Sequence, residues 1–144
     1  MFAPHTGDGA TAVVKELEHT ADLALRIDAG SPADLVAGAV LGLARVIAGE
    51  KPARTLERRA VELEEEDAET ALVSLLNAVI GAHEIDGFLP SRAQVTLSTP
   101  GGLVVVMWGE TGVAAEVHVK AATFHELAIA ETDGQWSAVV VFDV

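Results

Sequence analysis

The segment DLALRIDAGSPADLVAGAVLGLARVIAG at residues 22–49 decides the fold class, because its apolar residues change period from two to about 3.6. In its first part three aliphatic residues alternate with polar or small ones, which is typical of a half-buried strand. From Ser31-Pro32 onward a favoured N-cap and a first-turn proline predict a helix with one apolar face, ended by Gly49. A strand that leads directly into an amphipathic helix indicates a mixed fold.

The remainder of the chain continues this mixed pattern. The acidic run EEEDAET precedes a second amphipathic helix, which Asp86-Gly87 ends and whose apolar stripe includes His83. Strands are expected at residues 13–17, 57–64, 92–98, 102–109, 113–121, 125–131 and 135–142, the last two joined by the hairpin signal Asp133-Gly134. We therefore expect an α+β fold: a single compact domain with two helices packed on a mainly antiparallel multi-stranded β-sheet. Residues 1–12 are expected to form a loosely ordered lead-in, with the domain at 13–144.

Composition limits the classes of function. The chain of 144 residues carries nine lysines and arginines against 22 aspartates and glutamates, a formal net charge of −13. Nucleic-acid binders neutralise phosphates with basic side chains, so direct RNA or DNA binding is not expected. The absence of cysteine excludes disulfides and zinc-thiolate sites. Without a secretory signal or an apolar run of membrane-spanning length, a cytoplasmic protein that does not bind membranes is expected.

Four segments far apart in the sequence carry a resemblance to a known family. They are LEHTAD at 17–22, GFL at 87–89, KAATFHEL at 120–127 and VVVFDV at 139–144. With these segments in this order, and with the pair Gly109-Glu110, the chain resembles the archease family from about Val14 to Val144. Residues 13–144 are thus expected to form an archease-like domain, in which Phe124 stands where tyrosine is common.

The resemblance implies a non-catalytic partner protein with no catalytic residues and no small-molecule substrate of its own. Archeases activate the RtcB-type RNA ligase of tRNA splicing and RNA repair, by promoting its guanylylation by GTP and its repeated turnover. The family also carries a divalent-metal site, with calcium among its ions, which the matched motifs assign here to Asp22, Asp143 and the terminal carboxylate of Val144. Four further residues of the matched motifs are expected to order this site or contact the ligase: His19, Thr20, Lys120 and His125.

The residues themselves are compatible with such a metal site. The nearly continuous apolar segment WSAVVVF predicts a strand buried on both faces, which delivers Asp143 and the chain-terminal carboxylate together to one end of a sheet. Asp22, at the start of another strand, would add a third anion. Crowded carboxylates repel one another unless a cation neutralises them, and oxygen ligands suit Ca²⁺, Mg²⁺ or Mn²⁺. From spacing alone, however, Asp22 also fits a turn and Asp143 a solvated chain end.

Two other functions remain open from the residues alone. A small metal-dependent phosphoester hydrolase could use His19 or His125 as a base, with Asp22 and Asp143 as metal ligands. No H-E-x-x-H motif, nucleophile elbow or P-loop supports a known hydrolytic or nucleotide-binding centre. A general chaperone would need a large exposed apolar segment, and the sequence shows none.

Overall fold

The computed structural model describes residues 5–17, 22–49, 51 and 53–144. Two helices are present in this part of the chain, α1 (Pro32–Ala48) and α2 (Ala68–Asp86). Nine strands accompany them: β1 (His5–Gly7), β2 (Val13–Leu17), β3 (Leu23–Ala29), β4 (Glu57–Glu64), β5 (Leu89–Thr99), β6 (Gly102–Glu110), β7 (Ala121–Ala122), β8 (Ala130–Thr132) and β9 (Gln135–Asp143). The predicted α+β class with two helices and antiparallel strands is confirmed.

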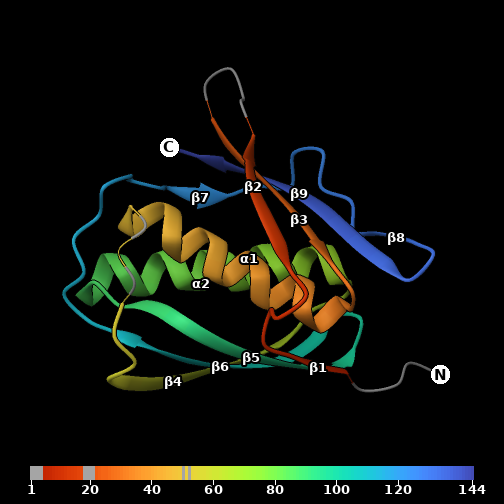
Figure 1. The fold of residues 1–144 in the computed structure, drawn as a ribbon, viewed down its shortest axis with the longest axis horizontal. Coiled ribbons are helices and arrows are strands. Elements are labelled where there is room, and N and C mark those ends of the chain that lie inside the picture. Colours follow the sequence, from red (N-terminus) through yellow and green to blue (C-terminus); the bar gives the residue numbers. More distant parts are fainter. Residues whose placement is uncertain (1–4, 18–21, 50, 52) are drawn as a thin grey trace.

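The strands form two sheets rather than the single sheet that we expected. The first sheet has the order β1-β5-β6-β4, and the second has the order β2-β3-β9-β7, with β8 also paired to β9. Figure 1 shows both helices lying between the two sheets, so the molecule has three layers. The alternating period of a strand says which face is buried but not which sheet the strand joins, and this is why the sequence did not separate the sheets.

The first helix explains why a second sheet is needed. We expected one apolar face on α1, but residues all around the helix are buried, among them Leu35, Val36 and Ala37 on different sides. A helix that is apolar on all sides must be covered on all sides, and here each sheet covers one of them. No helix in the described part of the chain is long and apolar enough to cross a membrane.

Two glycines let the second sheet approach α1 closely. A Cβ atom on Gly38 would lie 2.4 Å from the Cβ of Ala12, and one on Gly42 would lie 2.7 Å from Cγ1 of Val14. Strand β2 and the residue before it therefore pass directly over these two glycines. Any side chain at either position would force the strand away from the helix.

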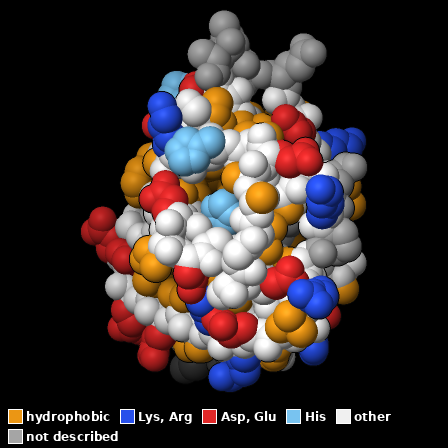
Figure 2. Space-filling model, turned by 90° about the vertical axis from the view of Figure 1, so that its left-hand side faces the viewer, with side chains coloured by type: hydrophobic (Ala, Val, Ile, Leu, Met, Phe, Trp, Pro, Cys, Tyr) orange, Lys and Arg blue, Asp and Glu red, His pale blue; other side chains and the backbone are white. Residues whose placement is uncertain are grey.

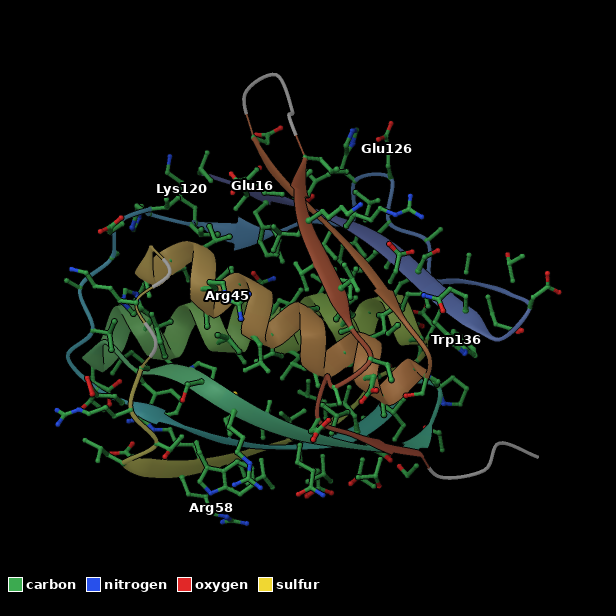
Figure 3. All side chains as sticks on the ribbon, viewed as in Figure 1. Glu16, Arg45, Arg58, Lys120, Glu126 and Trp136 are labelled. Atoms are coloured by element: carbon green, nitrogen blue, oxygen red, sulfur yellow. The ribbon has the colours of Figure 1, made fainter. Side chains whose placement is uncertain are left out.

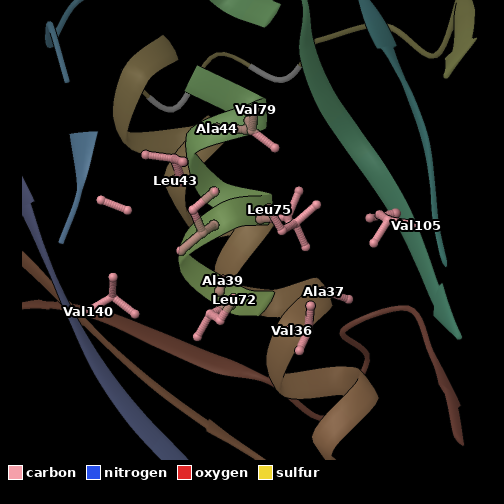
Figure 4. Close-up of a cluster of buried hydrophobic side chains, with 14 of the residues drawn as sticks. Val36, Ala37, Ala39, Leu43, Ala44, Leu72, Leu75, Val79, Val105 and Val140 are labelled. Carbon is pink, nitrogen blue, oxygen red and sulfur yellow. The ribbon is translucent and has the colours of Figure 1, made fainter. Parts of the chain in front are cut away.

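The core lies where the two helices meet the inner faces of both sheets. Figure 4 shows Leu43 of α1 and Leu75 of α2, with Val105 of β6 on one side of the two helices and Val140 of β9 on the other. All four side chains are fully buried. Burial of a large aliphatic side chain stabilises a fold by roughly 1.5–3 kcal/mol, so this shared core holds the three layers together.

We expected a loose lead-in at residues 1–12, of which the structure describes residues 5–12, and this described part is attached to the fold. Strand β1 pairs antiparallel with β5, with Gly7 opposite Val95. The carboxylate of Asp34, in the first turn of α1, then accepts hydrogen bonds from the backbone amides of Gly9 and Thr11 and from the Thr11 hydroxyl. This turn of the chain is thus attached to the start of α1.

The connection between β6 and β7 is the clearest departure from the predicted strands. A strand was expected at 113–121, but only Ala121–Ala122 is a strand, and the predicted strand at 125–131 is reduced to Ala130–Thr132. The backbone of the connection pairs with helix ends instead: Gly112 N–H donates to Asp86 O at 2.9 Å, and Glu116 N–H donates to Ile47 O at 2.7 Å. The last carbonyls of a helix lack partners within it, so residues 111–120 satisfy both helix ends as they cross between the sheets.

Candidate metal and partner site

Strand β9 occupies the middle of the second sheet and brings distant parts of the sequence together. On one side it pairs with β3, where Leu23 lies opposite Phe142. On the other side it pairs with β7, where Ala122 lies opposite the same Phe142. Figure 1 shows β9 running between β3 and β7 towards the C-terminus. Three of the four motif segments therefore meet at one end of this sheet.

We call this end the motif corner and define it as residues 22–23, 120–127 and 142–144. Its central residue is Phe142, which is only 1% exposed and packs in the core. A buried aromatic side chain flanked by two strands fixes the end of β9 in place. The residues that follow Phe142 are therefore held at a defined position on the surface.

The segment 120–127 is attached to β9 through its backbone. Lys120 N–H donates to the carbonyl of Asp143 at 2.8 Å, and Thr123 N–H donates to the carbonyl of Val141 at 2.9 Å. The hydroxyl of Thr123 donates to the same Val141 carbonyl, also at 2.9 Å. The loop beyond Thr123 is thus anchored at its base, while Phe124 and His125 remain exposed.

A helix residue that the sequence analysis missed holds this segment from the other side. The side-chain amide of Asn77, on α2, accepts from Ala122 N–H at 2.8 Å and donates to Ala122 O at 3.3 Å. Asparagine is unfavourable within a helix, and its occurrence on α2 was the signal that could have indicated such a role. Asn77 pairs with the backbone of Ala122 as a neighbouring strand would and so sets the position of β7.

The three predicted metal ligands lie at the motif corner as follows. Asp22 is a half-buried residue in a bend directly before β3, Asp143 ends β9 in an exposed position, and Val144 follows it, 43% exposed. Asp22 and Asp143 each lie one position beyond the Leu23–Phe142 pair, on neighbouring antiparallel strands. Paired Cα atoms in such strands are about 4.5–5.5 Å apart, so the register places the two aspartates at the same end of the sheet.

Of the four residues predicted to order the metal site or contact the ligase, the structure describes two. His19 and Thr20 lie outside the described residues. Lys120 and His125 are exposed, and the ring of His125 lies 3.9 Å from the carboxylate of Glu126. In Figure 3 the labelled side chains of Lys120 and Glu126 both point away from the helices, on the outer side of the second sheet. Among residues that the structure describes, no three histidine, aspartate or glutamate side chains are grouped as a metal ion would need.

Figure 2 shows the end of the molecule at which both helices finish. Acidic, basic and histidine side chains are interspersed there with scattered apolar ones. His83, predicted at the edge of the core, is half-buried, and its Nε2 donates to the carbonyl of Val113 at 2.8 Å. His83 therefore fastens the 111–120 connection to α2 and serves the fold rather than the motif corner.

The other two matched motifs also serve the fold. Gly87 ends α2 with φ of 74°, a left-handed conformation that glycine adopts without strain. Gly109 lies opposite Pro90, and a Cβ there would come within 2.1 Å of the Leu89 carbonyl oxygen. Glu110 makes an exposed ion pair with Arg54 at 2.7 Å. Gly87 and Gly109 therefore serve the backbone of the fold, and Glu110 contributes a side-chain ion pair.

Comparison with known proteins decides the family. Residues 15–144 match the model of the Archease protein family (MTH1598/TM1083). The chain belongs to the archease family. The archease of Methanopyrus kandleri is 32% identical over 142 residues, which cover 90% of this chain and 98% of that protein. The archease of Thermococcus kodakarensis is 33% identical over 136 residues, covering 88% and 95% of the two chains.

Solved structures agree with this assignment to the archeases. Protein 1598 of Methanobacterium thermoautotrophicum superposes with a TM-score of 0.73 at 23% identity, over 91% of this chain and 98% of that one, which shows a shared fold. The crystal structure of "an archease, possible chaperone" from Thermotoga maritima superposes with a TM-score of 0.66 at 26% identity, over 90% and 96% of the two chains. The three-layer arrangement therefore agrees with solved relatives over most of its length.

Proposed function

We propose that this protein is a non-catalytic accessory protein of the cytoplasm that activates an RtcB-type RNA ligase by promoting its guanylylation and repeated turnover. Membership of the archease family supports the proposal at the level of the whole chain. The meeting of three motif segments at the motif corner is the structural observation that carries it. Motif residues that are distant in sequence but lie together on the surface are candidates for one functional site.

A divalent cation is the cofactor that this corner would take. Asp22, Asp143 and the carboxylate of Val144 would hold it, because all three offer oxygen donors and the β3–β9 register places the two aspartates at one end of the sheet. Calcium is favoured by the family, and magnesium and manganese accept the same donors. When bound, the cation would neutralise these carboxylates and hold the chain end against the start of β3.

The exposed side chains around the motif corner would contact the ligase. Phe124 is 56% exposed on the anchored loop, beside the exposed His125, and Lys120 lies at the base of the same loop. An exposed aromatic residue on a fixed loop is the type of group that anchors protein interfaces. The net charge of −13 would also attract a partner whose surface is basic because it handles phosphates.

The first test measures formation of the ligase–GMP adduct with wild-type protein and with Asp22→Asn or Asp143→Asn. Each neutral variant should lose most of the stimulation, because each removes one anionic ligand with little change in shape. Asp133→Asn is the matched control, because it lies in the β8–β9 turn at the opposite end of β9. The steps from Gln135 to Asp143 along this strand span about 26 Å at ~3.3 Å per residue. Equal stimulation by all four proteins would reject a role for the metal site.

The second test separates this function from metal-dependent hydrolysis. The protein without ligase is incubated with phosphoester substrates in the presence of Mn²⁺ or Ca²⁺. We expect no turnover, since the proposed role is to act on the ligase. Hydrolysis that disappears in the Asp22→Asn variant would contradict the proposal and favour a hydrolase.

A further inference from the structure

A hollow of about 370 Å³ lies away from the motif corner, between the second half of α1 and the start of β5. Its apolar wall includes Leu41, Ala44 and Leu89, and its polar groups come from Arg45, Lys51 and Ser91. We call it the α1–β5 pocket. Its volume falls within the range of about 300–1,000 Å³ that is usual for small-molecule sites.

The hydroxyl of Ser91 is an unusual feature of this pocket. Ser91 is the extra residue of a bulge, because Pro90 pairs with Gly109 and Arg92 pairs with the next residue, Trp108. Its Oγ atom is buried and has no hydrogen-bond partner among the residues that the structure describes. Buried polar groups are nearly always paired, and an unpaired one calls for an explanation such as a missing ligand. Bulges commonly redirect a side chain towards a functional site.

The two cations of the pocket are also unpaired within the described residues. Neither Arg45 nor Lys51 makes an ion pair there, whereas Arg26, Arg54 and Arg59 each pair with an acidic side chain. No aspartate or glutamate is among the described residues that line the pocket. In a chain of net charge −13, a hollow whose described lining carries two cationic and no acidic side chains is locally suited to an anion.

We propose that the α1–β5 pocket binds a phosphate monoester that carries a small apolar body. A phosphate monoester has a charge of about −1.5 to −2 near neutral pH and three terminal oxygens, which match two cations and three donor groups. The guanidinium of Arg45 can bind two of these oxygens side by side. The Ser91 hydroxyl, now buried, can donate to another when its side chain rotates towards the pocket. A carboxylate would neutralise only one of the cations. The apolar wall then covers the body of the ligand.

The test uses phenyl phosphate as the probe and follows backbone amide signals of the isotopically labelled full chain by NMR. Phenyl phosphate should shift the amides of Ala44, Ala48 and Ser91 in a saturable manner, with millimolar affinity or better, so titration to about 10 mM is sufficient. Inorganic phosphate should bind at least several-fold more weakly, and phenol should cause no such shifts. No saturable shift with phenyl phosphate would overturn the proposal. Equal affinity for inorganic phosphate would overturn the role of the apolar wall.

Variants test the residues in the same titration. Arg45→Gln should weaken phenyl phosphate binding by about tenfold or more, and Ser91→Ala by a few-fold, as expected for the loss of charged and neutral hydrogen bonds. Lys51→Gln removes the other positive charge of the pocket, and it should also weaken binding if Arg45→Gln alters the fold. Arg58→Gln, an exposed arginine that does not line the pocket, is the control and should change affinity by less than about twofold.

A cation near the end of α1 also complements the partial negative charge of that helix end. If Arg45→Gln and Lys51→Gln lower stability while leaving phenyl phosphate affinity unchanged, the two side chains serve only the fold, and the proposal is overturned. Equal weakening by Arg58→Gln would show a non-specific charge effect and would overturn it as well.

Discussion

Asp34 shows how a single residue can join two parts of a fold. It is the one buried charged side chain of the described residues, 7% exposed, and it accepts hydrogen bonds from Gly9 and Thr11, which lie more than 20 residues earlier in the chain. Its own backbone N–H is capped by the Ser31 hydroxyl at 3.1 Å. A capping role for Asp34 can be predicted from sequence, but its side chain serves the N-terminal turn instead.

We predict that Asp34→Ala lowers the free energy of unfolding by about 1–3 kcal/mol, because it leaves partly buried donors of Gly9 and Thr11 unpaired. Urea unfolding followed by circular dichroism measures this change. Asp8→Ala is the matched control in the same turn, since Asp8 is exposed and its carboxylate accepts an exposed hydrogen bond from Ala10 N–H. An equal loss in the free energy of unfolding in both variants would contradict the role given to Asp34.

The same carboxylate should make stability depend on pH. Burial raises the pKa of Asp34, but hydrogen bonds from Thr11 and the neighbouring backbone outweigh this effect and hold the pKa below its ordinary value. A carboxyl whose pKa is lower in the folded state stabilises the fold above its unfolded pKa, about 3.9, and loses this contribution as pH falls through the folded value. The stability difference between wild type and Asp34→Asn should therefore shrink below about pH 4. A difference that grows with acid would contradict this.

At the scale of elements, the connection at 111–120 shows why local pattern failed. Its residues include alternating apolar side chains, such as Val113 and Val119, which is why a strand was predicted. Its backbone donors, however, pair with the carbonyls of Asp86, Gly87 and Ile47 at the two helix ends. Both helices finish at one end of the molecule, and their last carbonyls accept hydrogen bonds from this segment in place of a neighbouring strand. The spacing of apolar residues in the sequence does not indicate such a partner.

Two glycines of α2 and its cap give opposite predictions for the same substitution. Gly87→Ala should destabilise by about 1–3 kcal/mol, because φ there is 74° and a Cβ would lie 2.8 Å from Gly112 N. Gly81→Ala should stabilise by roughly 0.5–1 kcal/mol, because this helix position has nothing within 4 Å of the added Cβ. Thermal unfolding of both variants measures the two signs. Destabilisation by both would show that the α2 position is not open as described.

At the scale of the whole molecule, apolar burial between the layers stabilises the fold, whereas the net charge opposes it. The three layers bury their apolar faces on one another, whereas the net charge of −13 is spread over the surface. The described ion pairs, such as Arg26–Asp28 and Arg54–Glu110, are exposed and contribute little each. Repulsion among the unpaired acids should therefore dominate the electrostatic part of the stability.

We predict that added salt raises the melting temperature of this protein. Between about 0.01 and 0.15 M sodium chloride the Debye length falls from roughly 30 to 8 Å, which screens the long-range repulsion of a highly acidic chain. Calorimetry at several salt concentrations in a metal-free buffer provides the measurement. A melting temperature that falls over this range would mean that the surface ion pairs outweigh the repulsion.

The sequence by itself determined the local elements of this protein. Both helices begin and end within a residue or two of their predicted caps, and the predictions for β2, β4 and β6 match the observed strands closely. These features depend on side-chain period and on caps such as Ser31 and Gly49, which are all local in the chain. The family motifs were also visible, because they are short runs of sequence.

Only the tertiary structure decided how these elements pair. It divided the strands between two sheets, added β1 to the first of them, and placed Leu23 and Ala122 on either side of Phe142. It also found Asn77 and the Ser91 bulge, whose roles depend on partners at other positions in the chain. Strand pairing and buried polar contacts depend on hydrogen bonds between residues far apart in sequence. A local sequence pattern does not specify which residue will be the hydrogen-bond partner of a backbone group.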